Sequence, residues 1–221
     1  MMQSMKITAV MQDGRVAGTD PWFPLDSILA SVWIRRNYPE LAYLPIQDTH
    51  DIIAAELPFE KHGQGDDWYW ACSFNQSKKL DEYVTHWHKR FDDDKERYLD
   101  FRGKRGKVDT QSAKYKAYRM PLVIQVFDRL IWYAVGDIEL VRSLCQGVTH
   151  IGKKTSQGFG AVDYWNVEPW LEDWSEIGPN GLTRAIPLGD NMHTGNIQKH
   201  TIRPPYWLQD NSRVCILPEE L

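Results

Sequence analysis

The sequence predicts an α+β domain built on a ferredoxin-like, or RRM-like, sheet. Its segments follow the order strand, helix, strand, polar excursion, two strands, helix, glycine-rich loop, strand and tail, and this order favours an α+β architecture. Hydrophobic residues make up 42% and charged residues 25% of the 221-residue chain, a balance typical of globular proteins with a buried core. We therefore expect one domain spanning residues 1–221.

The first elements follow from hydrophobic periodicity. The run MKITAVM at 5–11 predicts a strand. Apolar residues then recur at helical spacing from 25 to 37, so we expect an amphipathic helix there, ended by Pro39. The segment DDWYWACSF at 66–74 alternates well enough to predict a second strand.

Residues 77–112 are mostly polar and charged, and we interpret them as an excursion from the core, either a loop or a projecting hairpin. The window from Lys95 to Arg119 holds nine Lys or Arg and three acidic residues, a charge of +6. Because the whole chain carries −4, the remainder carries −10. Bulk charge argues against nucleic-acid binding by the whole surface, but this distribution favours binding at one basic place.

The second half of the chain shows a helix between strands. Asp137 is suited to be the N-cap of a helix over 138–145, which Gly147 closes. The segment after residue 170 has little periodicity, and we expect an irregular tail with one possible final strand. Strands are predicted over 113–121, 129–135, 161–170 and 213–217.

The loop GKKTSQGFG at 152–160 supports two interpretations equally well. As a helix-to-strand turn, it needs glycines only because they accept a positive φ. As a phosphate-binding loop, it exposes backbone N–H groups, which bind anions, beside two lysines that neutralise phosphate. Phe159 either packs inward or offers its ring to a base.

The same loop nearly matches a Walker A motif, counted from Gly147 to Lys153. Two departures argue against nucleotide hydrolysis. Lys154 stands where the motif needs Ser or Thr as a magnesium ligand, and the loop follows a helix and precedes a strand, which reverses the required order.

Two stretches resemble a known family. HIGKKTSQGFGAV at 150–162 resembles the glycine-rich signature loop of the CRISPR-associated RAMP superfamily. ITAVMQDGRVAGTDPWFPLDSILASVW at 7–33 is similar to the start of the Cas-five-like subunit of type IV CRISPR effector complexes, and WYWACSF at 68–74 is similar to the same subunit. The excursion and the tail carry no such resemblance.

The resemblance implies a RAMP fold in which the 77–112 excursion is a thumb-like projection. It also implies a non-catalytic subunit that binds the 5′ handle of a guide RNA and nucleates the backbone filament. Expected partners are the neighbouring backbone and large subunits, with target DNA reached through the assembled complex by RNA pairing. No cofactor is expected.

The residues expected to contact RNA form two groups. By resemblance, the signature loop contacts RNA, and Phe159 joins it through its aromatic ring. A basic cluster in the excursion suits contact with phosphate or a neighbouring subunit, although a solvated basic face explains it equally well. The loop group comprises Gly152, Lys153, Lys154, Gly158, Phe159 and Gly160, and the basic cluster comprises Arg102, Lys104, Arg105 and Lys107.

The alternative function is a metal-independent endoribonuclease that processes precursor guide RNA. Relatives of this kind use His, Tyr or Lys as general acids and bases on a 2′-hydroxyl. Candidates exist here, but no spacing compels a mechanism, so we predict no catalytic residue. These candidates are Tyr115, Lys116, Tyr118 and His150.

Other features give weaker signals. His86 and His88 would share one face of a strand, but no third ligand stands at a telling distance, and His193 and His200 are weaker still, so no metal site is predicted. In IRPPYWLQD, Tyr206 and Trp207 either anchor the tail or face a partner protein or a base.

The compartment follows from the cysteines and from the hydrophobic runs. Three widely spaced cysteines without a Cys-x-x-Cys pair argue against a disulfide framework, so we expect a reduced, cytoplasmic setting. We identify no signal peptide and no apolar run long enough to cross a membrane.

Overall fold

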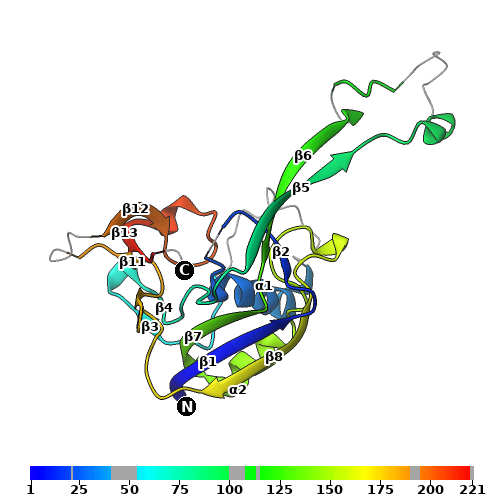
Figure 1. The fold of residues 1–221 in the computed structure, drawn as a ribbon. Coiled ribbons are helices and arrows are strands. Elements are labelled where there is room, and N and C mark those ends of the chain that lie inside the picture. Colours follow the sequence, from blue (N-terminus) through cyan, green and yellow to red (C-terminus); the bar gives the residue numbers. More distant parts are fainter. Residues whose placement is uncertain (21, 41–53, 100–107, 113–114, 190–194, 220–221) are drawn as a thin grey trace.

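The computed structural model describes residues 1–20, 22–40, 54–99, 108–112, 115–189 and 195–219, and it has an α+β architecture with antiparallel sheets (Figure 1). The central sheet has β1 (Met2–Met11) between β7 (Arg129–Asp137) and β8 (Val162–Pro169). All pairings in this sheet are antiparallel. The three corresponding strands expected from the sequence are confirmed.

The free edge of β7 is covered by an extended segment, 71–76. The Ser73 amide donates to the Tyr133 carbonyl at 2.8 Å, and the Val135 amide donates to the Ala71 carbonyl at 2.9 Å. The strand expected over 66–74 is therefore only partly correct. Its first part pairs as a short hairpin of β3 (Lys61–His62) and β4 (Tyr69–Trp70), and the remainder follows β7 without forming a regular ladder.

Both predicted helices are confirmed. Helix α1 (Leu25–Asn37) buries an apolar stripe in the main core, and α2 (Ile138–Cys145) packs on β1, β7 and β8. Asp137 is the N-cap, since its carboxylate accepts from the amides of Glu139 and Leu140. The helices approach closely at Gly147, where a Cβ would stand 2.6 Å from a methyl carbon of Val32.

A long two-stranded ribbon projects from this body (Figure 1). It consists of β5 (Asp81–Lys89) and β6 (Tyr118–Val126), and β2 (Arg15–Ala17) adds a third strand at its base. The strand expected over 113–121 is therefore displaced toward the C-terminus, because the Ala117 amide turns back to donate to the Thr110 carbonyl at 2.8 Å. Strand β5 is exposed along most of its length, which explains why its sequence lacks the apolar alternation of a core strand.

The expectation of an irregular tail is wrong, whereas the one final strand expected in it, over 213–217, is confirmed. The C-terminal segment forms a second sheet in the order β11–β13–β12, preceded by a small hairpin, and it covers its own cluster of buried residues that includes Phe74, Ile202 and Cys215. The other strands of this region are short or polar and are separated by glycine, proline and polar loops, so hydrophobic periodicity could not reveal them. The strands are β9 (Ile177–Gly178), β10 (Gly181–Leu182), β11 (Ile186–Pro187), β12 (Asn196–Thr201) and β13 (Ser212–Leu217), with short 3-10 turns elsewhere at Gly65–Asp67, Asp93–Tyr98, Thr155–Gln157 and Gln209–Asn211.

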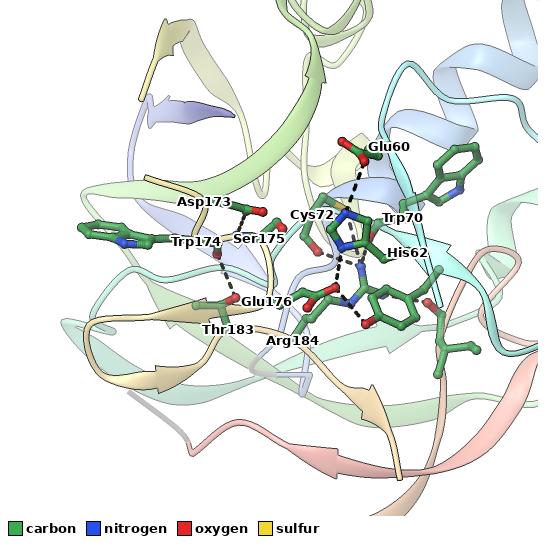
Figure 2. Close-up of polar contacts among 12 residues, drawn as sticks. Glu60, His62, Trp70, Cys72, Asp173, Trp174, Ser175, Glu176, Thr183 and Arg184 are labelled. Carbon is green, nitrogen blue, oxygen red and sulfur yellow. Dashed lines mark hydrogen bonds and ion pairs between the residues drawn. The ribbon is translucent and has the colours of Figure 1, made fainter. Parts of the chain in front are cut away.

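A buried arginine joins the edge of the central sheet to the C-terminal segment (Figure 2). The side chain of Arg184 is fully buried, and its guanidinium donates to the carbonyls of Trp70, Cys72 and Ile202. It also lies 4.5 Å from the centre of the Tyr69 ring. One guanidinium thus satisfies backbone acceptors from both the edge of the central sheet and the C-terminal segment.

Glu176 forms a second connection in the same region (Figure 2). Its carboxylate accepts from the Tyr69 hydroxyl at 2.8 Å and lies 2.5 Å from Nδ1 of His62. Burial and the neighbouring Glu176 carboxylate raise the pKa of Tyr69, so this hydroxyl stays protonated and remains a donor. The contact fixes the C-terminal hairpin segment on the β3–β4 hairpin.

A buried carboxylate ties the tail to α1. The Tyr206 hydroxyl lies 2.9 and 3.0 Å from the two carboxylate oxygens of Asp26, and the Ser27 amide donates to one of them at 2.8 Å. Burial raises the pKa of Asp26 to about 6, although Arg184 and these hydrogen bonds oppose the change. The folded protein therefore binds a proton at Asp26 more tightly than the unfolded chain does.

This buried acid predicts a pH dependence. Because the pKa of Asp26 is higher in the folded state, its contribution to stability is greatest at low pH and is lost as the pH rises through about 6. The rise in the pKa of Asp26 from 3.8 to about 6 corresponds to a decrease in the free energy of unfolding on the order of 3 kcal/mol between pH 4 and 7. Asp26→Asn should remove this component. Urea unfolding of both proteins at several pH values measures it, and parallel pH profiles would contradict the assignment.

Within the described ranges, no helix is long and apolar enough to cross a membrane.

Candidate nucleic-acid interface

The glycine-rich loop, 152–160, lies on the surface beside β2. Most of the loop is exposed. The Lys153 amide donates to the Ala17 carbonyl at 2.7 Å, and the Gly160 amide donates to the Arg15 carbonyl at 2.7 Å. These hydrogen bonds fix both ends of the loop to β2, so its middle is presented to solvent.

The order of elements around the loop matches the sequence expectation. It follows α2 and precedes β8, whereas a Walker A loop follows a strand and precedes a helix. The observed order therefore supports the argument against a nucleotide-hydrolysing loop.

Gly160 fixes the path of the chain at the end of the loop. Its φ is +74°, and a Cβ at this position would stand 1.8 Å from the carbonyl oxygen of Ile151. The Ile151 amide donates to the Gly160 carbonyl at 2.9 Å, so the two backbones are in direct contact. Only glycine fits this approach. Gly158 also has a positive φ, +87°, but open space surrounds its Cβ position.

The two lysines of the loop have different environments. Lys153 is exposed, whereas Lys154 is half-buried and has a φ of +57°. The Lys154 ammonium lies 3.4 Å from the centre of the Trp87 ring on β5, a cation–π contact. The loop is thus attached to the projecting ribbon through Lys154, while Lys153 remains accessible to an anion.

Phe159 lies at the root of the loop and is half-buried. The Arg15 guanidinium lies 5.5 Å from the centre of its ring and forms an ion pair with Asp13 at 2.6 Å. Burial acts against ionisation of Asp13, but the hydrogen bonds and charge of Arg15 lower the pKa of this carboxyl overall. Arg15 is a basic residue of this surface that sequence reasoning missed, since it stands between glycines in a short strand.

An aromatic and basic surface continues along the ribbon. Trp87 pairs with Met120 and Lys89 pairs with Tyr118, so these four side chains share one face of the two strands. The Trp87 and Tyr118 rings are 5.4 Å apart, and the Lys89 ammonium lies 5.6 Å from the Tyr118 ring. Sequence reasoning missed this face, because it becomes visible only when the register of β5 and β6 is known.

The basic cluster of the excursion cannot be placed on this surface. Its members belong to the segment between the ends of β5 and β6, beyond the turn Asp93–Tyr98. Arg102, Lys104, Arg105 and Lys107 lie outside the described residues, so their role stays a prediction.

Two of the four candidate nuclease residues, Tyr115 and Tyr118, make aromatic packing contacts. Tyr115 packs on Phe91 with ring centres 5.2 Å apart, and Tyr118 packs on Trp87. His150 is exposed at the start of the loop, and its Nδ1 lies 3.0 Å from the Thr149 hydroxyl. Lys116 is exposed. The rings of Tyr115 and Tyr118 thus pack on two different aromatic residues, as expected of ordinary strand and loop packing.

The histidines that could serve as metal ligands have different surroundings. His86 and His88 share one face of β5, and the Arg119 guanidinium lies 3.0 Å from Nδ1 of His86, which places a positive charge beside this pair. His200 is packed among aromatic rings, and burial lowers its pKa. His193 lies outside the described residues. In the part of the chain that the structure describes, no group of three His, Cys, Asp or Glu side chains could hold a metal ion.

Tyr206 and Trp207 of the tail have different environments. Tyr206 bonds to Asp26 and anchors the tail, as one of the two interpretations proposed. The neighbouring Trp207 is 58% exposed and is available to a partner.

Comparison with known proteins identifies a relationship over nearly the whole chain. The model of a family described as CRISPR type IV associated protein Csf3 matches residues 3–218. A comparison with curated proteins finds no match. The family match confirms the type IV CRISPR relationship expected from the N-terminal and glycine-loop residues. The chain therefore belongs to the Csf3 family of type IV CRISPR-associated proteins.

Proposed function

We propose that this chain is a non-catalytic RNA-binding subunit of a type IV CRISPR effector complex, which binds the 5′ handle of the guide RNA and nucleates the backbone filament. The observation that carries the proposal is the glycine-rich loop, which is anchored to β2 at both ends, exposes Lys153 and adjoins an aromatic and basic face. Exposed main chain beside lysines suits phosphate oxygens, and aromatic rings suit unstacked bases.

The sheet supports a ferredoxin-like RAMP domain. The edge segment 71–76, β7, β1 and β8 lie side by side, and the two helices follow the first and third of these extended segments in chain order. That arrangement is the one expected of a ferredoxin-like sheet. The ribbon of β5 and β6 would then be the thumb-like projection.

The proposal includes its setting. Partners would be the neighbouring backbone and large subunits, and target DNA would be reached through the assembled complex. The three cysteines are buried and free, and buried thiols of this kind are typical of a reducing compartment such as the cytoplasm.

Replacing both lysines of the loop tests the proposal. Lys153→Ala with Lys154→Ala should weaken binding of the RNA that co-purifies with the chain and lower the salt slope of log K by about 1 to 2, since each phosphate contact on a single strand adds about 0.7. Sequencing the co-purified RNA identifies the probe, which is then synthesised with a fluorescent end label. Fluorescence anisotropy at several salt concentrations measures both quantities.

A matched control removes two lysines elsewhere. Lys6 and Lys199 lie on β1 and β12, away from the loop, and Lys6→Ala with Lys199→Ala causes the same change in net charge. We expect the control to retain the slope of the native protein. An unchanged slope in the loop variant would argue against this RNA contact, and discrete RNA fragments produced by the purified chain would indicate the endoribonuclease instead.

A further inference from the structure

Two hollows lie on α1, one on each side of a pair of serines. The first, of about 350 Å³, lies between α1 and the glycine-rich loop. The second, of about 230 Å³, lies between α1 and the tail. Ser27 and Ser31 line both hollows, so only two small side chains separate them.

The first hollow has the chemistry of a sugar–phosphate site. Arg35 contributes a guanidinium from α1, and His150 and Thr155 contribute polar side chains from the loop side. Gly152 brings exposed main chain to its wall. Hydroxyl groups, a cation and bare backbone are the groups that contact phosphate and 2′-hydroxyl oxygens.

The second hollow is apolar and aromatic. Its walls are Ala30 and Ile34 of α1 and the tail segment 204–207, which ends with Trp207. The indole is 58% exposed, whereas the preceding Tyr206 is held by its hydrogen bonds to the buried Asp26. The tail backbone is thus fixed beside α1 with a large ring presented at its surface.

The serines form a low ridge between the two hollows. They lie one helical turn apart, about 6 Å along the axis, and their short side chains leave room for a chain to pass over. The Ser31 hydroxyl donates to the Ile28 carbonyl at 2.7 Å, so its proton is used within the helix and its oxygen can still accept a hydrogen bond. A single-stranded nucleic acid crossing this ridge would have polar groups at its backbone on one side and an aromatic ring for its base on the other.

We propose that Trp207 is a stacking platform for one base of single-stranded RNA, whose sugar–phosphate backbone crosses Ser27 and Ser31 from the glycine-rich loop. This inference rests on the proposed function of the loop. RNA is favoured over a protein ligand because the apolar hollow adjoins a cationic and hydroxyl-lined one across Ser27 and Ser31, a combination that matches a nucleotide. Stacking on an aromatic ring needs no particular base.

The test uses the full chain and the synthesised, end-labelled RNA that co-purifies with it. Trp207→Ala should weaken binding on the order of 10-fold or more, the usual range for loss of one base–aromatic stack. Its salt slope should stay at the native value, since no phosphate contact is removed. Trp207→Phe, which keeps an aromatic ring, should recover most of the affinity. RNA carrying 5-iodouridine should cross-link to Trp207 on irradiation.

The controls separate this site from the loop. Val214→Ala changes another exposed apolar residue, 53% exposed on β13, and should bind as the native protein does. Native affinity in Trp207→Ala together with weakened binding in the double-lysine variant would overturn the Trp207 site and leave the loop as the RNA contact. Native affinity in both would overturn both proposals. If Trp207→Ala binds RNA normally but loses a neighbouring subunit on co-purification, the hollow is a protein-docking site and the inference is wrong.

Discussion

Arg184→Ala is expected to destabilise the protein by roughly 3–5 kcal/mol, because it leaves three buried carbonyls without their donor and opens a cavity. The Arg184 side chain is fully buried, so the three carbonyls have no direct access to bulk solvent. Urea unfolding measures the change. Hydrogen exchange should show that protection is lost first in β12 and β13, since Arg184 connects their segment to the central sheet. Native exchange rates in those strands would contradict this role.

Two further variants test whether the lost hydrogen bonds, rather than the lost side-chain volume, cause the destabilisation. Arg184→Met keeps much of the side-chain volume but removes the donors, so it should remain strongly destabilising. Arg203→Ala is the matched control, since Arg203 also donates to two backbone carbonyls, those of Asp66 and Trp68, at 2.7 and 2.8 Å. It is only partly buried, and water can satisfy those carbonyls after its removal. A loss of about 1 kcal/mol is expected there.

Gly160→Ala is expected to displace the glycine-rich loop and to reduce RNA binding more than any lysine substitution. The new methyl group would meet the Ile151 carbonyl, so the hydrogen bonds from Gly160 to Arg15 and from Ile151 to Gly160 could not both persist. The unfolding free energy should fall by about 3 kcal/mol or more, the positive φ accounting for 1–2 kcal/mol of it. Urea unfolding and RNA anisotropy are the two measurements.

Gly158→Ala provides the comparison within the same loop. Its φ is also positive, but nothing lies within 4 Å of its Cβ position, so only the backbone cost of about 1–2 kcal/mol applies. Equal effects of the two substitutions would mean that the close contact with Ile151 does not organise the loop.

The elements that sequence reasoning predicted correctly are those whose signals are local. Helix α1 buries apolar residues at helical spacing from Leu25 to Val32, and Asp137 begins α2 as its N-cap. Strands β1 and β7 are buried and apolar. In each case a single segment contains both the periodicity and the boundary residue, so no knowledge of tertiary contacts is needed.

The missed features depend on distant partners. Strand β5 is polar and exposed, and it becomes a strand only through pairing with β6 some 40 residues later. The contacts of Arg184 span 114 residues to Trp70, and its burial contradicts the usual exposure of arginine. For the candidate interface, the loop itself was evident from its glycines and lysines, whereas Arg15 and Trp87 joined it only through the fold.

Strand β2 serves two neighbours at once. Its residues pair with the base of β6, and its carbonyls at Arg15 and Ala17 receive the two ends of the glycine-rich loop. Strand β2 therefore connects the base of the ribbon directly to the glycine-rich loop. We expect a neighbouring protein that displaces the end of the ribbon to displace the loop as well. Binding of that protein and binding of RNA by the loop would then be coupled.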